Sequence, residues 1–417
     1  MTDREFETVC VIGLGYVGLP TAAVLASRGM HVVGVDIDPT TVALINKGKV
    51  HIVEPDLDIL VNGAVVTGKL KATIKPEPAD AFIIAVPTPF TTDHKPDLSF
   101  VEAAVRSLAP VLKKGDLVII ESTCPVGTTD SACGWLAATR PDLTFPHTAH
   151  DAADVNISHS PERVLPGKVL IELVRNDRVI GGVSQRCAER TANLYRVAVE
   201  GKCLLTNART AELVKLTENA YRDVNIAFAN ELSLVCDDLG IDVWEAIELA
   251  NHHPRVNILS PGPGVGGHCI AVDPWFIVDS APDSTPLIRA ARAVNDGKPG
   301  KIVARILAAA QQLDHPAIAC LGLAYKADID DLRESPAMDI TEALAKSAGT
   351  TIRVVEPHIK QLPTRLAKYD QVTFCDLASA LEQAQIVVLL TDHQAFRAIT
   401  PDQLAGKKIF DTRGVWR

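Results

Sequence analysis

Strand-length runs alternate with amphipathic stretches along the first part of the chain. Such runs occur at Val9–Ile12, His31–Val35, Phe82–Val86, Leu117–Glu121 and Val155–Ser160, and the fifth reads as the last strand of this part. Helical patterns separate the runs, as at Ser99–Leu112, which lies between the third and the fourth. Strands that alternate with helices in this way predict an α/β fold with a doubly wound parallel sheet.

A long helical pattern follows, roughly from Thr210 to Leu239. Apolar residues recur there at helical spacing, the stretch holds no proline or glycine, and Gly240 ends it. A helix of this length would run about 45 Å, which is long enough to bridge two domains.

The C-terminal part repeats the beginning of the chain. Ala317–Tyr325 is similar to Val9–Tyr16, and a helical pattern at Met338–Ser347 and a strand ending at Glu356 follow it. Further strand patterns lie at Gln385–Leu390 and Lys408–Phe410. This internal half-repeat predicts a second Rossmann-like sheet. We therefore expect three parts, at residues 1–205, 206–313 and 314–417.

Composition narrows the class of protein. The chain has 417 residues and a formal net charge of −10, which makes a nucleic-acid or membrane-surface role a poor fit and means that an anionic substrate needs local basic residues. Nine cysteines without a CxxC pair indicate reduced thiols. The N-terminus is charged and polar, unlike a signal peptide, and the longest apolar runs are too short to span a bilayer. We expect a soluble, cytoplasmic protein without membrane insertion.

The first strand runs into a dinucleotide-binding pattern. The glycines Gly13, Gly15 and Gly18 have the spacing that makes a tight turn, leaves room for a pyrophosphate and lets a helix pack on the strand. Asp36 ends the second strand, where a carboxylate takes the ribose hydroxyls and repels a 2′-phosphate, so NAD is favoured over NADP. Thr88 and Thr123 are candidate cofactor contacts or simple turn residues.

The stretch Ser260–Pro274 carries the candidate chemistry. Cys269 lies where its glycines end and an apolar run begins, and if that run starts a helix, Asp273 lies on the same face as the thiol. A thiol beside free backbone N–H groups is the setting of a cysteine nucleophile. The alternative is a tight connection with a buried, inert cysteine.

Polar residues elsewhere suggest further contacts. Lys215, Asn219 and Arg222 share one face of the long helix, as a site-facing or a solvated stripe. The loop with Lys326 and Arg333 can hold phosphates by charge, or it is a decayed repeat with surface charges. The adjacent His252 and His253 lack a third ligand nearby, so we predict no metal site.

Taken together, these motifs resemble the UDP-glucose/GDP-mannose dehydrogenase family. The resemblance rests on motifs that span nearly the whole chain: Gly13-Leu-Gly-Tyr-Val-Gly-Leu-Pro, Val86-Pro-Thr-Pro, Pro161-Glu-Arg, Lys215-Leu-Thr-Glu-Asn, Gly264-Val-Gly-Gly-His-Cys and Tyr325-Lys with Arg333-Glu-Ser-Pro. Within the family, Glu162–Gly167, the segment from His253 and the ending Asp411–Arg417 are similar to the branch that acts on UDP-N-acetyl-D-mannosamine. UDP-glucose enzymes tend to carry Phe-Leu where this chain has Arg163-Val164.

The resemblance implies a four-electron oxidation of a primary alcohol to a carboxylate with two NAD, which supplies a nucleotide-activated uronic acid for surface polysaccharides. It implies two Rossmann-like domains, for NAD and for the UDP-sugar, joined by a long central helix, in homodimers or higher oligomers. It implies Cys269 as the nucleophile, Lys215 and Asn219 beside the reacting oxygen, Asp273 near the thiol and Glu162 for hydrolysis. Implied cofactor contacts are Gly13, Gly15, Tyr16, Val17, Gly18, Asp36, Thr88, Thr123 and Arg333. Implied substrate contacts are Arg163, Val164, Lys215, Asn219, Arg222, His252, Arg255, Asn257, Gly264, Tyr325, Lys326 and Arg413, of which Arg255 is the candidate supplied by a neighbouring subunit.

Three other functions would account for part of the sequence. Within the family, UDP-glucose or UDP-N-acetylglucosamine is the alternative substrate. A two-electron dehydrogenase or a nucleotide-sugar epimerase would leave Cys269 and its loop unexplained. An NAD-sensing regulatory protein would have no use for the Cys269 thiol or for the loop with Lys326 and Arg333.

Overall fold

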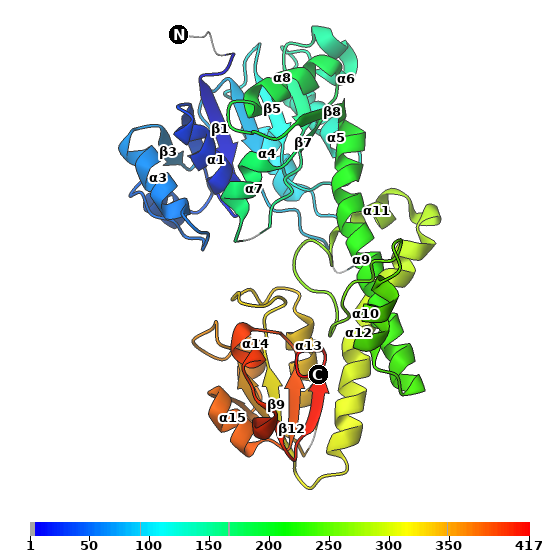
Figure 1. The fold of residues 1–417 in the computed structure, drawn as a ribbon. Helices are drawn as coiled ribbons and strands as arrows, with labels where there is room; N and C mark the ends of the chain where they lie inside the picture. Colours follow the sequence, from blue (N-terminus) through cyan, green and yellow to red (C-terminus); the bar gives the residue numbers. More distant parts are fainter. Residues whose placement is uncertain (1–4, 92, 166, 348) are drawn as a thin grey trace. The chain divides into compact units, whose positions relative to one another are not determined.

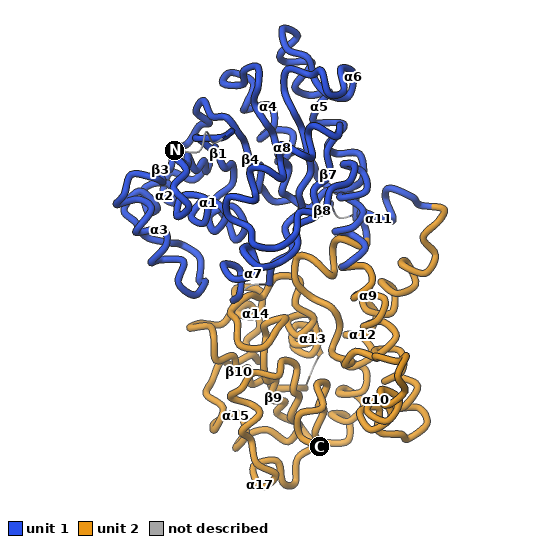
Figure 2. Tube along the Cα trace, turned by 45° about the horizontal axis from the view of Figure 1, so that its top comes forward, with its two compact units in different colours: residues 1–218, 275–282 blue, residues 219–274, 283–417 orange. Residues whose placement is uncertain are grey.

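The computed structural model describes residues 5–417 other than 92, 166 and 348. Its contacts divide the chain into two units (Figure 2). The first consists of residues 1–218 and 275–282, and the second of residues 219–274 and 283–417. The predicted division into three parts stays a prediction.

The first unit is built on an eight-stranded sheet with the order β3-β2-β1-β4-β5-β6-β7-β8 (Figure 1). Its strands are β1 (Thr8–Ile12), β2 (His31–Val35), β3 (Leu70–Thr73), β4 (Ala81–Ile84), β5 (Leu117–Ile120), β6 (Asn156–His159), β7 (Arg178–Gly182) and β8 (Cys203–Asn207). The five predicted strands correspond to β1, β2, β4, β5 and β6, because a run that is apolar on both faces can be buried only inside a covered sheet.

Helices cover both faces of this sheet. They are α1 (Gly18–Ser27), α2 (Pro39–Ile45), α3 (Leu57–Val66), α4 (Ser99–Ser107), α5 (Thr128–Thr139), α6 (Pro146–Ala149), the 3₁₀ turn η1 (His150–Ala152), α7 (Val169–Arg175) and α8 (Gln185–Tyr195). Alternate strand residues feed two cores, since Val9 and Val11 pack with α1 and Cys10 and Ile12 pack with α4 and α5.

The prediction that Val155–Ser160 is the last strand of this part is wrong. Two strands follow β6: β7 runs antiparallel to it, with His159 opposite Gly181, and β8 runs parallel to β7. The sequence pattern hid β7 because it begins with Arg178 and ends with two glycines. Gly181 is needed there, since a Cβ at this position would lie 2.5 Å from the carbonyl oxygen of Asn207.

Helix α9 (Ala208–Leu239) has 32 residues, begins in the first unit and ends in the second. It confirms the long central helix. The other helices of this middle part are α10 (Val243–Asn251), α11 (Asp273–Ser280), the 3₁₀ turn η2 (Pro282–Ser284) and α12 (Pro286–Ala310). Among the described residues no helix is both long enough and apolar enough to cross a membrane.

The second unit contains a five-stranded parallel sheet with the order β11-β10-β9-β12-β13. Its elements are β9 (Ala317–Leu321), α13 (Pro336–Ala345), β10 (Thr351–Val355), α14 (Thr364–Ala367), β11 (Val372–Phe374), α15 (Leu377–Gln383), β12 (Ile386–Leu389), α16 (Gln394–Arg397), α17 (Pro401–Leu404) and β13 (Lys408–Asp411).

The internal repeat is confirmed at the level of backbone geometry. Gly13 has φ +91° and donates to the carbonyl oxygen of Val35 at 2.8 Å. Gly322 has φ +94° and donates to the carbonyl oxygen of Val355 at 2.9 Å. Each unit therefore turns out of its central strand in the same way, and the chain is an α/β protein with two Rossmann-like sheets.

Candidate active site

The carboxyl edge of the first sheet forms a site for a dinucleotide. A Cβ at Gly18 would lie 1.8 Å from the carbonyl oxygen of Gly13, so α1 approaches the turn as closely as only glycine allows. A Cβ at Gly15 would meet no atom within 4 Å, which leaves open space where a pyrophosphate would approach. The Asp36 carboxylate is held at this edge by the N–H groups of Leu14 and Asp38, at 3.1 and 3.0 Å.

The other predicted cofactor contacts of this unit lie on neighbouring loops. Tyr16 is exposed on the glycine turn, and Val17 immediately precedes α1. Thr88 follows β4 and Thr123 follows β5, and the Ser122 hydroxyl joins these two loops by donating to the Val86 carbonyl oxygen at 2.7 Å. Arg333 belongs to the second unit, where it pairs with Asp331 at 2.7 Å, so its predicted cofactor contact stays a prediction.

Glu162 lies in the loop after β6 and is held at both carboxylate oxygens. Oε1 accepts the Arg163 N–H at 2.6 Å, and Oε2 accepts from the Arg178 guanidinium at 2.5 Å. The Arg163 guanidinium pairs with Glu218 on α9 at 2.7 Å. Val164 packs against the core under α1.

Cys269, Asp273 and Asn219 come together in the second unit. The Asn219 side-chain amide donates to Asp273 Oδ2 at 2.5 Å, and the Asp273 N–H donates to the Cys269 carbonyl oxygen at 2.9 Å. The helix begins at Asp273 itself, because the apolar run before it forms a turn. The expected one-turn separation of Cys269 and Asp273 is nevertheless kept by that backbone hydrogen bond. Lys215 lies one helical turn before Asn219 on α9.

The glycine-rich loop before Cys269 is fixed at both ends within the second unit. The Gly262 N–H donates to Asn230 Oδ1 at 2.8 Å, and the Gly267 N–H donates to the Arg333 carbonyl oxygen at 3.2 Å. Gly267 has φ +82°, and a Cβ there would lie 2.8 Å from the Tyr325 ring. A Cβ at Gly264 would lie 2.9 Å from Pro336. Two predicted substrate contacts, Tyr325 and Gly264, therefore lie along the cysteine loop.

Sequence reasoning missed the buried polar chain that supports this loop. From α12, Arg292 donates to Asp223 Oδ1 at 2.6 Å, and the Asn295 side chain donates to the same oxygen at 2.7 Å. Asn230 donates to Asn295 at 2.9 Å and then accepts the Gly262 N–H. The sequence signal that could have found this chain is the position of Asn230 in the middle of a long helical pattern, since an asparagine there usually has a specific partner.

A cavity of about 360 Å³ lies at the start of the same loop, in the second unit. It is lined by Arg397, Arg413 and Arg417 against one carboxylate, Asp392, together with Ser260, Pro261, Gly414 and Val415. Asp392 pairs with Arg413 at 2.9 Å and with Arg397 at 2.6 Å. Three guanidinium groups against one carboxylate give this acidic chain the local positive charge that an anionic ligand needs. Of the three arginines, only Arg413 was predicted.

The C-terminal residues form one wall of this cavity. The Asp411 carboxylate accepts the N–H groups of Arg413, Gly414, Val415 and Trp416 at 2.6 to 2.9 Å. A single side chain thus fixes the segment that carries Arg413.

The remaining predicted substrate contacts lie on exposed or partly exposed surface. His252, Arg255 and Asn257 are exposed in the loop after α10. The Asn251 side chain closes this loop, since its Oδ1 accepts the Ile258 N–H at 2.7 Å and its Nδ2 donates to the Ile258 carbonyl oxygen at 3.0 Å. Arg222 is exposed on α9, and Lys326 is partly exposed beside Tyr325. Their contacts with a substrate stay predictions.

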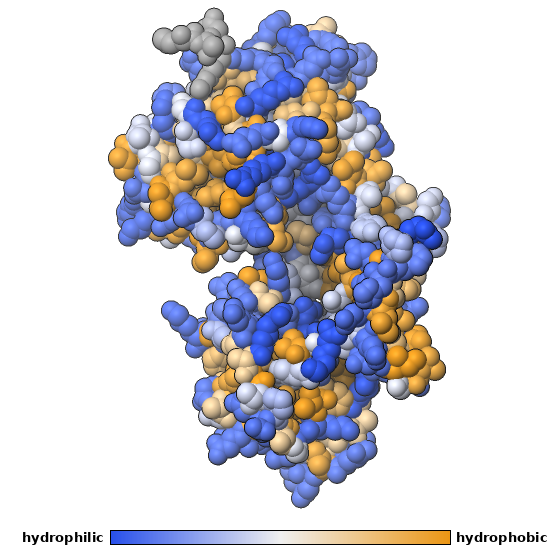
Figure 3. Space-filling model, in the orientation of Figure 1, coloured by the Kyte–Doolittle hydropathy of each residue, from blue (hydrophilic) through white to orange (hydrophobic). Residues whose placement is uncertain are grey.

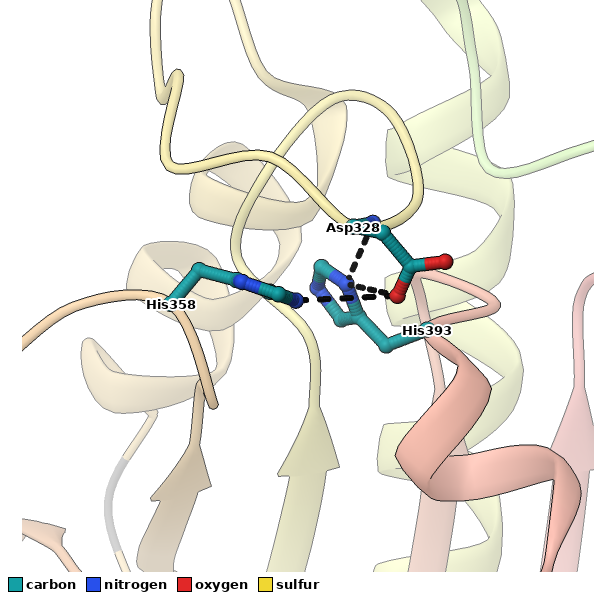
Figure 4. A group of neighbouring side chains, drawn as sticks. All are labelled: Asp328, His358 and His393. Atoms are coloured by element: carbon teal, nitrogen blue, oxygen red, sulfur yellow. Dashed lines mark hydrogen bonds and ion pairs between the residues drawn. The ribbon is translucent and has the colours of Figure 1, made fainter. Parts of the chain in front are cut away.

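Asp328, His358 and His393 have the spacing of a metal site, with their ligand atoms within 4.8 Å of one another (Figure 4). His393 is fully buried and uses both ring nitrogens: Nδ1 accepts the Asp328 N–H at 2.9 Å, and Nε2 faces Glu356 at 3.0 Å. A metal ion would have to displace the Asp328 N–H. We therefore interpret the group as a set of hydrogen bonds that fixes the loop after β9.

Three segments of the chain match domains of one family. Residues 7–199 match the NAD binding domain of the UDP-glucose/GDP-mannose dehydrogenase family, residues 209–297 its central domain and residues 319–417 its UDP binding domain.

Individual relatives match over the full length. The chain is 59% identical over 414 residues to an NDP-N-acetyl-D-galactosaminuronic acid dehydrogenase of Ralstonia nicotianae, covering 99% of this chain and 97% of the relative. It is 58% identical over 422 residues to a UDP-N-acetyl-D-mannosamine dehydrogenase of Yersinia pestis, covering 99% and 100%. A solved UDP-D-ManNAc dehydrogenase of Pyrococcus horikoshii superposes with a TM-score of 0.89 at 40% identity, covering 98% of this chain and 96% of the other.

Alkylation should separate Cys269 from the other thiols. Cys269 is exposed, whereas burial raises the pKa of Cys10 and of Cys320 to about 12 and also raises the pKa of the partly buried Cys203 and Cys375. We expect limiting iodoacetamide to modify Cys269 first, as measured by peptide mass spectrometry of the native protein. Faster modification of Cys203 or Cys375 would contradict this ordering.

Proposed function

The chain belongs to the UDP-glucose/GDP-mannose dehydrogenase family, and from this premise we propose that it oxidises UDP-N-acetyl-D-mannosamine to UDP-N-acetyl-D-mannosaminuronate. Full-length relatives named for N-acetylated sugars support the substrate. The observation that carries the four-electron chemistry is the exposed Cys269 at the end of a fixed glycine loop, whose carbonyl oxygen accepts the N–H of Asp273, the residue that Asn219 bonds.

A four-electron oxidation explains why a cysteine nucleophile is needed. Bound NAD⁺ supplies the hydride acceptor for both oxidations. The aldehyde formed first has no alkoxide carbon from which a second hydride can leave. Addition of the Cys269 thiolate restores such a carbon as a thiohemiacetal, and its oxidation gives a thioester that water cleaves. The overall balance is one alcohol, one water and two NAD⁺ giving one carboxylate, two NADH and three protons.

The remaining catalytic residues follow from the charges that develop. Lys215 and Asn219 lie one turn apart on α9 and would offset negative charge on the reacting oxygen. Asp273 accepts a hydrogen bond from the Asn219 amide and so fixes its orientation. Glu162 would take a proton from the water that attacks the thioester.

The substrate's charged part has a matching surface in the second unit. The cavity with Arg397, Arg413 and Arg417 supplies positive charge at the start of the glycine loop. We propose that a nucleoside diphosphate lies there with Tyr325 and Lys326, and that Arg222, His252, Asn257 and Arg255, the last from a neighbouring subunit, complete the site. Arg163 and Val164 would select the N-acetylated sugar. An N-acetyl-D-galactosamine substrate is the second candidate, because the 59% identical relative is named for its uronic acid.

We also propose the cellular setting and the domain roles. The product would supply a uronic acid for surface polysaccharide synthesis in the cytoplasm. Residues 1–205 would bind NAD, 206–313 would carry the cysteine loop and the subunit interface, and 314–417 would bind the UDP moiety, in keeping with the three family segments.

The direct test counts NADH. With UDP-N-acetylmannosamine we expect two NADH per substrate and a higher kcat/KM than with UDP-glucose, UDP-N-acetylglucosamine or UDP-N-acetylgalactosamine. Cys269→Ser should bind NAD and UDP-sugar yet lose steady turnover, while Cys203→Ser serves as a matched thiol control. A Cys269→Ser enzyme with near wild-type rates and two NADH per substrate would refute the thiohemiacetal route.

Cofactor preference should depend on Asp36. Its carboxylate would repel a 2′-phosphate, so Asp36→Asn should narrow the ratio of kcat/KM for NAD to that for NADP by about tenfold, which corresponds to ~1.4 kcal/mol. Asp38→Asn removes a nearby carboxylate that only caps α2, and it should leave the ratio unchanged. Equal use of both cofactors by the wild type would contradict the assignment of Asp36.

Subunit association should depend on an exposed apolar stripe. Tyr221, Phe228 and Val235 recur every seven residues on α9 and are 66%, 55% and 46% exposed, and apolar residues gather on this part of the surface (Figure 3). We propose this stripe as the homodimer interface. Phe228→Asp should lower the mass measured by light scattering to that of one chain, whereas Ile59→Asp, on exposed α3, should not.

A further inference from the structure

Arg178 lies at the edge of the first sheet where Glu162 lies, because of the direction of β7. The strands β1 to β6 that precede it are parallel, and their carboxyl ends share one edge. Since β7 is antiparallel to β6 with His159 opposite Gly181, its first residue extends past the end of β6 at that edge. One Arg178 nitrogen donates to Glu162 Oε2 at 2.5 Å, and another donates to Glu121 Oε1 at 2.7 Å.

The guanidinium is enclosed as well as paired. Arg178 is 5% exposed, and its guanidinium carbon lies 4.1 Å from the centre of the Tyr195 ring. The Tyr195 hydroxyl donates to the same Glu121 oxygen at 2.9 Å. Arg178, Glu121 and Tyr195 therefore form a rigid, desolvated block behind Glu162, and electrostatic effects are strong in such surroundings.

This block holds one cation between two carboxylates. Burial, together with the charge of Glu162, raises the pKa of Glu121 although Arg178 opposes the shift. Other titratable groups nearby are Tyr195 on α8 and Cys203, which is paired with Arg178 across β7 and β8. The carboxylates of Glu172 on α7 and Asp177 before β7 line a small cavity together with Glu162 and Arg178. The neighbouring Arg163 is directed to Glu218 instead. Glu162 and Glu121 thus bond to the same guanidinium group, and Glu121 competes with Glu162 for it.

Glu162 keeps the capacity to accept a proton. A carboxylate has about four acceptor positions, and Arg178 and the Arg163 N–H occupy one each. A cavity of about 10 Å³, close to the space of one water, is lined by Glu162 and Arg178 together with residues of α7 and the loop before β7.

We propose that Arg178 is the positioning residue for Glu162 as general base, and that Glu121 sets how strongly Arg178 holds it. This inference rests on the proposed thioester hydrolysis. Water forms a bond to the thioester carbon and gives one proton to Glu162, the carbonyl π electrons move to oxygen, and their return breaks the C–S bond so that sulfur leaves as the thiolate. Glu162 then releases its proton to solvent. Arg178 keeps its protons throughout.

Two substitutions should move the pH dependence in opposite directions. Arg178→Gln leaves Glu162 beside Glu121 with no cation, which favours the protonated base, so the acidic limb of the pH–rate profile for thioester hydrolysis should move up by about one pH unit. Glu121→Gln removes the competing carboxylate, so the same limb should move down. Arg178→Lys keeps the charge and should restore part of the wild-type midpoint. A purely structural role would lower the rate without this pair of opposite shifts.

The hydrolysis step is followed by quenching single turnovers and measuring the protein-bound thioester by mass spectrometry at each pH. Glu121→Gln keeps its size and can still bond to Arg178 and Tyr195, so it tests the proposal even where Arg178→Gln fails to fold. Glu162→Gln is the reference and should accumulate thioester. Normal hydrolysis by Glu162→Gln would overturn the role of Glu162 itself. A different pair of results would overturn only the role of Arg178 and Glu121. In that case Glu162→Gln accumulates thioester, but the acidic limb of the pH–rate profile of Glu121→Gln stays in place or moves up.

Discussion

The hydrogen bond from the Gly262 N–H to Asn230 determines where the cysteine loop begins. Asn230 is not oriented by itself, because its amide also bonds to Asn295, which bonds to Asp223 beside Arg292. Such a buried chain is costly to form unless its members are paired, and once formed it permits few arrangements. The start of the cysteine loop is therefore held in one position. The Tyr325 ring and the Arg333 carbonyl oxygen fix its other end at Gly267.

The two sheets show how one turn can serve two purposes. Both turn at a glycine with positive φ and both carry an acid after the second strand. Asp36 reaches only the Leu14 N–H of its turn, and the space beside Gly15 stays open. The longer Glu356 accepts the N–H groups of both Leu323 and Ala324, at 2.7 and 3.0 Å. A protein carboxylate thus occupies backbone donors that could otherwise receive a ligand anion, which is a physical reason why the second turn lacks the later glycines.

Much of this arrangement could be predicted from local patterns. The first glycine turn with Asp36, the long helix and the repeated sheet each leave a periodic or spaced signal in the sequence. The pairs that hold the site together leave none: Asp223 meets Arg292, and Glu121 meets Arg178, across distant segments. Strand β7 was missed because its arginine and glycines serve close packing and ion pairing. Arg397 and Arg417 were missed because only the folded chain brings them to Arg413.

The contrast between Cys269 and the other cysteines has a consequence for oxidative stress. Oxidants attack thiolates that solvent can reach, whereas the buried thiols of Cys10, Cys133 and Cys320 are shielded by the cores in which they lie. Damage by peroxide would therefore concentrate at Cys269, and under the proposed mechanism it would stop turnover while the fold persists. At the sulfenic acid stage a cellular reductant could restore that sulfur, so the exposure of the proposed nucleophile also provides a route to its repair.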